Sequence, residues 1–213
     1  MDLVAHSPDD LLVLLRTRQW LERAVIGLTL CPFAKSVHVR AQVRYSVSHA
    51  ETYAALRDDL RRELLALSEA DPDAVDTTLL VAPRMLSEFL DYNEFLKLAD
   101  AELEKLRLDG VLQIASFHPD YCFADLAQDD VANCSNRSPY PILHLLREAS
   151  VTRAVRAFPE AAQIFEKNVA TLRALGQAGF ERVLLGEPAS SGLDAGSAHD
   201  AGAVAAGLIR PAG

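Results

Sequence analysis

Three short apolar runs alternate with two long segments of helical periodicity in the middle of this chain, and that alternation limits the folds it can adopt. Residues Val43–Val47 alternate apolar with polar side chains, Thr77–Pro83 ("TTLLVAP") form an apolar run that proline ends, and Val111–Phe117 ("VLQIASF") form a third run. These patterns predict three strands, since alternation is typical of half-buried strands and short β-branched runs of buried ones. Right-handed crossovers between them would make neighbouring strands parallel.

Apolar residues recur every three or four positions in the segments around these runs, which predicts helices. In the first of them, Ser7 fits the N-cap and Pro8 the first helical position. The predicted helices span about Asp9–Leu30, Glu51–Ser68, Ser87–Arg107, Tyr140–Ala149, Ser150–Ala157 and Pro159–Gln177.

These elements predict a single α+β domain over residues 1–185, with a small three- to four-stranded, partly parallel sheet and helices packed on it. The remaining segment, Gly186–Gly213, is rich in Gly, Ala and Ser and lacks large apolar residues at regular spacing. Such a segment has little apolar surface to bury, so we expect a disordered tail.

The composition excludes several classes of protein. The 213 residues carry a formal net charge of −9, which argues against a nucleic-acid partner, because neutralising phosphates needs a basic face. No run approaches the roughly 18 consecutive apolar residues of a membrane span, and the N-terminus has no basic region ahead of an apolar core. We therefore expect no membrane partner and a cytoplasmic location. Three cysteines are too few for a disulfide scaffold, so we expect reduced thiols.

Basic residues are concentrated in two windows of this acidic chain. Ala24–Ala50 contains Lys35, Arg40 and Arg44 and no acidic residue. Val131–Pro159 contains four arginines against Glu148 alone. These windows are either parts of one anion-binding site or sets of exposed arginines on separate surfaces.

The stretch Ser116–Ser150 concentrates residues that can carry chemistry, since it holds two of the six histidines, two of the three cysteines and three of the ten prolines. Ligands in parallel sheets tend to bind beyond the carboxyl ends of the strands. The segments "HPDYC" (His118–Cys122) and "APRM" (Ala82–Met85) would lie at that edge. His118 is therefore our candidate catalytic residue, as an acid, a base or a ligand. The alternative is a histidine that hydrogen-bonds a backbone carbonyl and helps the loop turn.

Three blocks stand out in the sequence: "LCPFA" (Leu30–Ala34), "FHPDYCF" (Phe117–Phe123) and "NRSPYPILHLLREASV" (Asn136–Val151). They resemble those of the DUF1415 family, a group of bacterial proteins of unknown function. The similarity covers about Asp9 to Phe180 and excludes the tail. The resemblance implies a shared fold and a shared site, and it does not name a reaction.

Five further residues are candidates for binding a ligand. Asn136 and Arg137 precede a proline-stiffened turn, and arginine suits the bidentate recognition of carboxylate or phosphate. His144 and Arg147 would share one face of the predicted helix, and Tyr121 would line the same pocket. The alternatives are a stiffened turn at Arg137, a solvated helix face at His144 and simple packing at Tyr121.

A metal site would use His118, Cys122, Cys134 and His144, with Cys31 as a distant fifth ligand. The carboxylates of Asp120, Asp125, Asp129 and Asp130 could alternatively serve a hard cation, although no loop pattern for one is recognisable. Zinc sites favour close Cys-x2-4-Cys pairs, and this chain has none, so we assign no metal ligand. Cys31 follows a predicted helix and has no second cysteine near it, which favours a small buried residue over a catalytic thiol. The cofactor stays unknown, since no phosphate-binding glycine loop, dinucleotide fingerprint or nucleophile elbow is present.

The main hypothesis is a protein that binds or transforms a small anionic metabolite in a pocket formed by His118, Arg137, His144 and Arg147. One alternative is a non-catalytic interaction module whose basic windows dock an acidic partner, and another is a metal-binding protein. The first hypothesis requires the four side chains to converge in a hollow, and the second requires them to spread over a surface. The sequence leaves open whether the protein is an enzyme and what its oligomeric state is.

Overall fold

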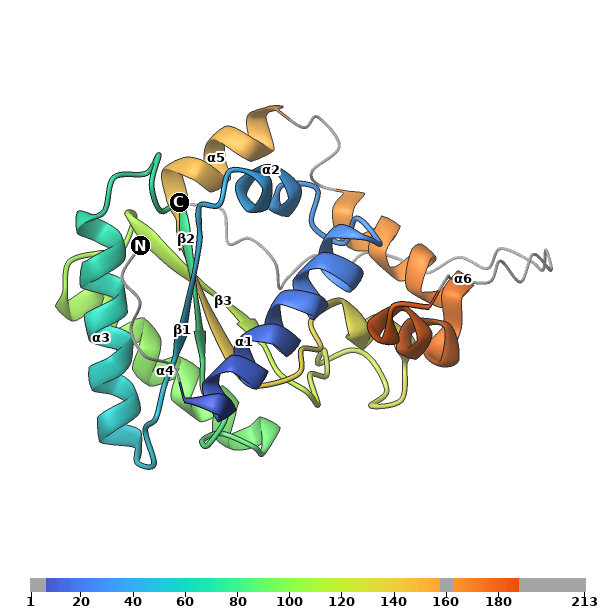
Figure 1. The fold of residues 1–213 in the computed structure, drawn as a ribbon, viewed down its shortest axis with the longest axis horizontal. Coiled ribbons are helices and arrows are strands. Elements are labelled where there is room, and N and C mark those ends of the chain that lie inside the picture. Colours follow the sequence, from blue (N-terminus) through green and yellow to red (C-terminus); the bar gives the residue numbers. More distant parts are fainter. Residues whose placement is uncertain (1–6, 158–162, 188–213) are drawn as a thin grey trace.

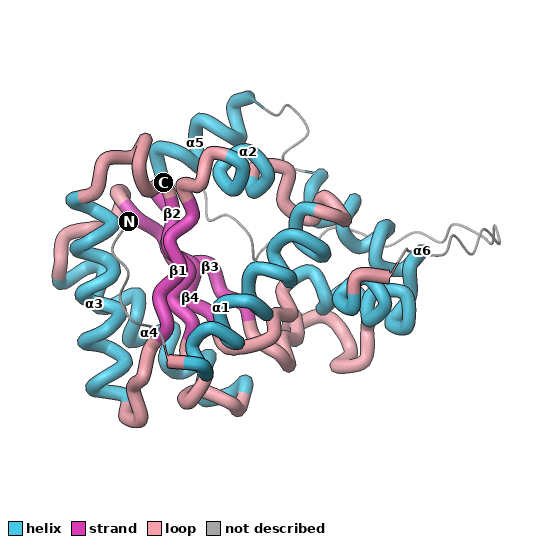
Figure 2. The backbone as a smooth tube through the Cα atoms, viewed as in Figure 1, coloured by secondary structure: helices cyan, strands magenta, loops and turns pink. Residues whose placement is uncertain are grey.

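A four-stranded sheet lies at the centre of the computed structural model, which describes residues 7–157 and 163–187 (Figures 1 and 2). Its strands lie in the order β1-β2-β4-β3. The three strands predicted from the sequence are confirmed, and β4 is an additional strand. The bounds are Val43–Val47 for β1, Thr77–Val81 for β2, Leu112–Phe117 for β3 and Ile142–Arg147 for β4.

The last strand in the sequence, β4, lies inside the sheet. β1 pairs with β2 in parallel, whereas β4 pairs antiparallel with β2 on one side and with β3 on the other. β2 and β3 therefore run in the same direction without being neighbours. The expectation of parallel neighbours is correct for β1 and β2 and wrong for the other two pairs. With helices packed on a mixed sheet, the predicted α+β class is confirmed.

The prediction of a helix over Tyr140–Ala149 is wrong. Ile142–Arg147 is strand β4, and helix α5 begins only at Glu148 and runs to Ala157, so that Ser150 lies inside it rather than at its cap. An apolar run such as "ILHLL" is typical of a strand buried on both faces as well as of a buried helical segment. The segment forms a strand because it pairs through backbone hydrogen bonds with β2 on one side and with β3 on the other.

The helix predicted over Asp9–Leu30 begins as predicted but divides into two elements and ends at Ile26, and a short helix follows it. Ser7 is the N-cap: its Oγ accepts a hydrogen bond from the backbone N of Asp10, and the Asp10 carboxylate accepts one from the backbone N of Ser7. This reciprocal pair satisfies two donors at the helix start. The elements are α1 (Pro8–Trp20), the π-helix η1 (Leu21–Ile26) and α2 (Ala34–Val39).

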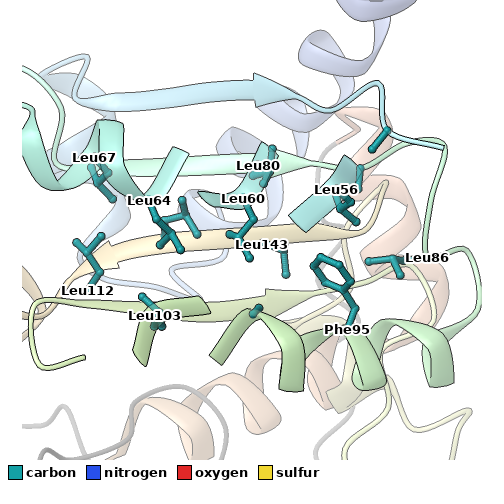
Figure 3. Packing of buried hydrophobic residues seen from close by; sticks show 14 of the residues in the cluster. Leu56, Leu60, Leu64, Leu67, Leu80, Leu86, Phe95, Leu103, Leu112 and Leu143 are labelled. Carbon is teal, nitrogen blue, oxygen red and sulfur yellow. The ribbon is translucent and has the colours of Figure 1, made fainter. Parts of the chain in front are cut away.

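Helices α3 (Tyr53–Glu69) and α4 (Phe89–Lys105) pack against one face of the sheet (Figure 3). Both confirm predicted helices. Leucines at helical spacing on α3 and Phe95 on α4 pack against buried strand residues. The largest fully buried residues there are Leu56, Leu60, Leu64, Leu67, Leu80, Tyr92, Phe95, Leu112, Leu143 and Leu145.

Helix α1 and the π-helix η1 lie across the other face (Figure 1). Trp20 meets the Phe117 ring edge-on, with 5.1 Å between ring centroids, and its Nε1 donates to the backbone oxygen of Arg137 at 2.8 Å. The last helix, α6 (Ile164–Leu185), packs on the short 3-10 helix η2 (Val131–Ser135) and is interrupted at Gly176. Pro159, the predicted start of this helix, and residues 188–213 of the predicted tail lie outside the described residues. None of the helices in the described ranges is long and apolar enough to cross a membrane.

Candidate functional site

The carboxyl ends of β2 and β3 lie at the same edge of the sheet, because these two strands run in the same direction. The segments that follow them are Ala82–Glu88 and His118–Tyr121, which include the two segments predicted to form a functional edge. A direct hydrogen bond joins them, since Nε2 of His118 lies 2.8 Å from the backbone oxygen of Leu86. The structure therefore brings the two predicted edge segments together.

His118 is fully buried and uses both ring nitrogens within the fold. Its Nδ1 accepts from the backbone N of Asp120 at 3.0 Å, so the ring proton resides on Nε2, which donates to Leu86. The rings of Phe89 and Tyr92 lie 5.3 and 5.2 Å from the imidazole, measured between centroids. Burial lowers the pKa of His118, and the carbonyl of Leu86 and the charge of Asp120 oppose this only in part. The imidazole is thus a neutral bridge between two loops.

The hydroxyl of Tyr92 secures the strands beside this bridge. It accepts from the backbone N of Phe117 at 3.1 Å and donates to the backbone oxygen of Ile142 at 2.8 Å. Tyr92 is fully buried, and burial raises the pKa of its phenol. The end of β3 and the start of β4 are therefore tied to α4 by one side chain.

Asn136 and Arg137 lie beside His118 because the segment Asn136–Ser138 pairs with His118 through backbone hydrogen bonds. The backbone N of His118 donates to the oxygen of Asn136, and the backbone N of Ser138 donates to the oxygen of His118. The buried side chain of Asn136 donates through Nδ2 to the backbone oxygen of Ser116 at 3.2 Å. The side chain of Asn136 therefore joins the same two segments that the backbone hydrogen bonds join.

The guanidinium of Arg137 is directed into the loop that connects β3 with η2. It donates through Nη2 to the oxygen of Gln128 at 2.6 Å and through Nε to the oxygen of Tyr121 at 3.3 Å. Asn133 holds the same loop, since its Oδ1 accepts from the backbone N of Phe123 and its Nδ2 donates to the oxygen of Ala127. Arg137, which was predicted to bind a ligand, thus fixes the loop from inside together with Asn133.

A hollow of about 550 Å³ opens at this edge, outside the bridge made by His118. The start of α4 and the loop after β3 line it, and the Tyr121 ring contacts that of Phe89 at a tilt of 55°, with 5.2 Å between centroids. Among the described lining residues, three are carboxylates and none is basic. The lining comprises Glu88, Phe89, Leu90, Asp91, Asp120, Cys122 and Gln128.

Glu88, Asp91 and Gln128 are the polar lining residues that were not predicted from the sequence. The signal for Glu88 and Asp91 was present, since they follow the "APRM" segment at the start of the next predicted helix. Gln128 carries no sequence signal, because only the folding of the long loop returns it to the start of α4.

His144 does not meet His118. It lies within β4 opposite Leu79 and Ala115, and its ring contacts Phe117 on the side of the sheet that α1 covers. The Thr77 hydroxyl donates to the oxygen of Leu145 at 2.6 Å, so its oxygen accepts from His144 Nε2 at 2.7 Å. The predicted neighbour on a helical face, Arg147, points to the opposite face, since side chains alternate along a strand. Burial lowers the pKa of His144 to about 4.

Arg147 is buried and caps the end of α3 rather than lying on an exposed helical face. Its Nη2 donates to the backbone oxygens of Leu67 and Ala70, each at 2.6 Å, and to that of Val75 at 3.2 Å. Its strand position is opposite Leu112, at the end of the sheet away from His118. The four side chains of the proposed anion pocket therefore do not converge: Arg137 lies beside His118, and His144 and Arg147 lie elsewhere.

The three cysteines, Cys31, Cys122 and Cys134, are all free thiols and form no disulfide with one another. Burial raises the pKa of both Cys31 and Cys134. Cys122 lines the edge hollow, and its thiol donates to the oxygens of Phe123 and Leu126, both at 3.6 Å. Within residues 7–157 and 163–187, no three His, Cys, Asp or Glu side chains are grouped so that they could hold a metal ion.

Comparisons with known proteins agree with the resemblance noted in the sequence. The family model described as "Protein of unknown function (DUF1415)" matches residues 13–182. No curated protein and no solved structure matches the chain. The matched range contains the blocks at Leu30–Ala34, Phe117–Phe123 and Asn136–Val151, and two of these build the edge around His118. The chain is a member of the DUF1415 family.

Proposed function

We propose that the protein binds, in the edge hollow, a small organic cation that also has an apolar part. The observation that carries this proposal is the bridge made by His118, which holds the lining loops after β2 and β3 in fixed positions. A buried side chain that orders two loops around a hollow is a preorganised arrangement, and preorganisation favours binding.

The charge of the lining supports a positively charged ligand. Glu88, Asp91 and Asp120 line the hollow, and the described lining includes no lysine or arginine. An ammonium or guanidinium group gains Coulomb energy from such carboxylates and can donate hydrogen bonds to them. The ring of Phe89 and the side chain of Leu90 offer an apolar surface for the rest of the ligand. An organic cation fits this lining better than a bare metal ion, which needs several ligands grouped together.

His118 acts in this proposal as a positioning residue. The prediction that it acts as an acid or a base would require one of its two hydrogen bonds, to Leu86 or to Asp120, to break. Tyr121 supports the same hollow in this proposal through the contact of its ring with Phe89, which lines the hollow.

Two of the three carboxylates have a second explanation, and one does not. Glu88 and Asp91 lie at the N-terminus of α4, where acidic residues compensate the partial positive charge of the helix end. Asp120 belongs to the loop after β3, so the helix dipole does not explain its presence. Asp120 is therefore the residue that separates ligand binding from helix stabilisation.

The proposal is tested with benzylamine and with benzyl alcohol as its uncharged analogue, by calorimetric titration and thermal shift on the full chain. Benzylamine should bind and benzyl alcohol should bind more weakly. In the variant Asp120→Asn, benzylamine should bind about threefold more weakly, since an exposed ion pair contributes roughly 0.5–1 kcal/mol. Glu104→Gln, which removes an exposed carboxylate near the far end of α4, is the matched control and should change nothing.

Equal binding of benzylamine and benzyl alcohol, or equal losses in the two variants, would contradict the proposal. The first outcome would show that the hollow selects only for apolar contact. The second would show that the amine responds to the net charge of the protein rather than to this site.

The anionic metabolite predicted from the sequence is the second candidate. Arg137 and Arg147 donate to backbone carbonyls, so an anion held by them would have to compete with the loop and with the end of α3. The specific observation that favours an anion lies at another place, beside α5. The interaction module with an acidic partner would use the same face of α5, and the metal-binding alternative has no grouped ligands among the described residues.

A further inference from the structure

We propose that α5 carries a separate site for a small oxyanion, such as a phosphate or a carboxylate, held by Arg153 and Arg156. A second hollow, of about 470 Å³, lies between α5 and the turn before β3. Arg153 and Arg156 both line it. The remaining lining residues are Gly110, Glu148, Ala149 and Thr152.

The two arginines are available in a way that Arg137 and Arg147 are not. Arg156 has no hydrogen-bond or ion-pair partner in the described part of the chain. Arg153 donates through Nη2 to Ser150 Oγ at 3.0 Å, and this contact orients the side chain while leaving its other donors free. A guanidinium presents five donors in a planar fork, and this geometry matches carboxylate and phosphate oxygens.

The spacing on α5 directs these groups to one side. Arg153 and Arg156 are three residues apart, Thr152 and Arg156 are four apart, and side chains at these spacings are neighbours on a helix. The hydroxyl of Thr152 adds a donor for an oxyanion. Opposite them, Gly110 has φ +75°, and a Cβ added to it would meet no atom within 4 Å, so the space beside the glycine is open.

The site is distinct from the edge hollow. Gly110 precedes the first residue of β3, whereas the edge hollow lies beyond its last residue. β3 has six residues, which corresponds to roughly 20 Å along a strand. The lining charges are also opposite, since arginines predominate here and carboxylates predominate at the edge.

Two local features limit the strength of this site. Glu148 contributes a carboxylate to the same hollow and reduces its positive charge. Arg156 also lies in the last turn of α5, where a basic residue complements the negative helix end whether or not an anion binds. Only a ligand-dependent effect therefore separates an anion site from helix stabilisation.

The test measures inorganic phosphate and citrate binding to the full chain by calorimetric titration at constant ionic strength, in wild type and in Arg153→Gln, Arg156→Gln and Arg61→Gln. Arg61 is exposed on α3 and serves as the control that removes the same charge elsewhere. Arg153→Gln and Arg156→Gln should each weaken binding of the anion by about threefold to tenfold, while Arg61→Gln leaves it unchanged. Thermal unfolding without phosphate should show that all three variants are folded.

Three outcomes would overturn the proposal. The wild type could fail to bind either anion at millimolar concentration, or Arg61→Gln could weaken binding as much as the α5 variants do. A polyglutamate peptide could also bind through α5 while phosphate and citrate do not, and that result would assign the surface to an acidic protein partner. Benzylamine binding at the edge hollow is unaffected by these variants in every case, so the failure of one site is distinguishable from the failure of the other.

Discussion

The two histidines of the stretch Ser116–Ser150 were both predicted to belong to one site, and the structure places them on opposite faces of the sheet. His118 lies on the face that α4 covers and satisfies both ring nitrogens with backbone groups. His144 lies on the face that α1 covers and is bound through Nε2 to Thr77, while its Nδ1 has no partner in the described part of the chain. Burial lowers the pKa of both. A lowered histidine pKa therefore identifies a buried ring here, and only the hydrogen-bond partners show what the ring does.

The largest effect expected from this comparison is on stability at His118. His118→Ala removes a ring that fills space between Phe89 and Tyr92 and leaves the oxygen of Leu86 and the backbone N of Asp120 without their partner. We expect the free energy of unfolding to fall by ~3–4 kcal/mol, from lost packing and buried unsatisfied groups together. Urea unfolding of the variant measures this.

The exposed His49 provides the matched control for that substitution. Its side chain is 55% exposed, and its Nε2 lies 3.4 Å from the Asp10 carboxylate. His49→Ala should change the free energy of unfolding by less than ~0.5 kcal/mol. An equal loss of unfolding free energy in His118→Ala and His49→Ala would contradict the bridging role assigned to His118.

An intermediate effect is expected from pH at His144. Its pKa is about 4 in the folded protein and near 6.5 when unfolded, so between these values the unfolded chain binds a proton that the folded chain does not. Stability is therefore fully present above pH 6.5 and falls as the pH is lowered towards 4, by up to ~3 kcal/mol for this group. His118 contributes in the same direction.

Unfolding of wild type and His144→Gln in urea at pH 7 and at pH 4.5 measures this dependence. The variant should lose less stability on acidification, because glutamine does not titrate. If wild type and His144→Gln lost the same free energy of unfolding between pH 7 and pH 4.5, His144 would be accessible to protons in the folded protein.

The smallest effect is expected at Thr77, which orients His144. Thr77→Val keeps the β-branched shape and removes the hydroxyl that donates to the oxygen of Leu145 and accepts from His144. We expect a loss of ~1–2 kcal/mol, since two hydrogen bonds at a buried residue are removed. A change in the NMR signals of the His144 ring without a comparable change at His118 would confirm that the two rings are fixed independently.

The sequence predicts most of the local structure, because helices and the first three strands have clear periodicity. It fails at β4, where "ILHLL" fits a buried strand and a buried helix equally well. The choice depends on pairing with Thr77–Val81 and Leu112–Phe117, which are far away in the sequence. No local pattern contains that information.

The candidate site shows the same division. The edge beyond β2 and β3 was predictable, since both segments follow recognisable strands. The use of Arg137 and Arg147 was not, because an arginine that binds backbone carbonyls has the same sequence signal as one that binds an anion. The end of α3 beside Arg147 is adjacent only in three dimensions.

The central position of β4 has a consequence for synthesis on the ribosome. Until Ile142–Arg147 has emerged, β2 and β3 lack the strand that separates them, and each presents an unpaired edge. At that stage roughly 140 residues have been synthesised, and their sheet cannot yet form completely. The insertion of β4 between β2 and β3 is a slow step, because it pairs segments that are far apart in the sequence. Chaperones that shield exposed strand edges would have their greatest effect on this protein during that interval.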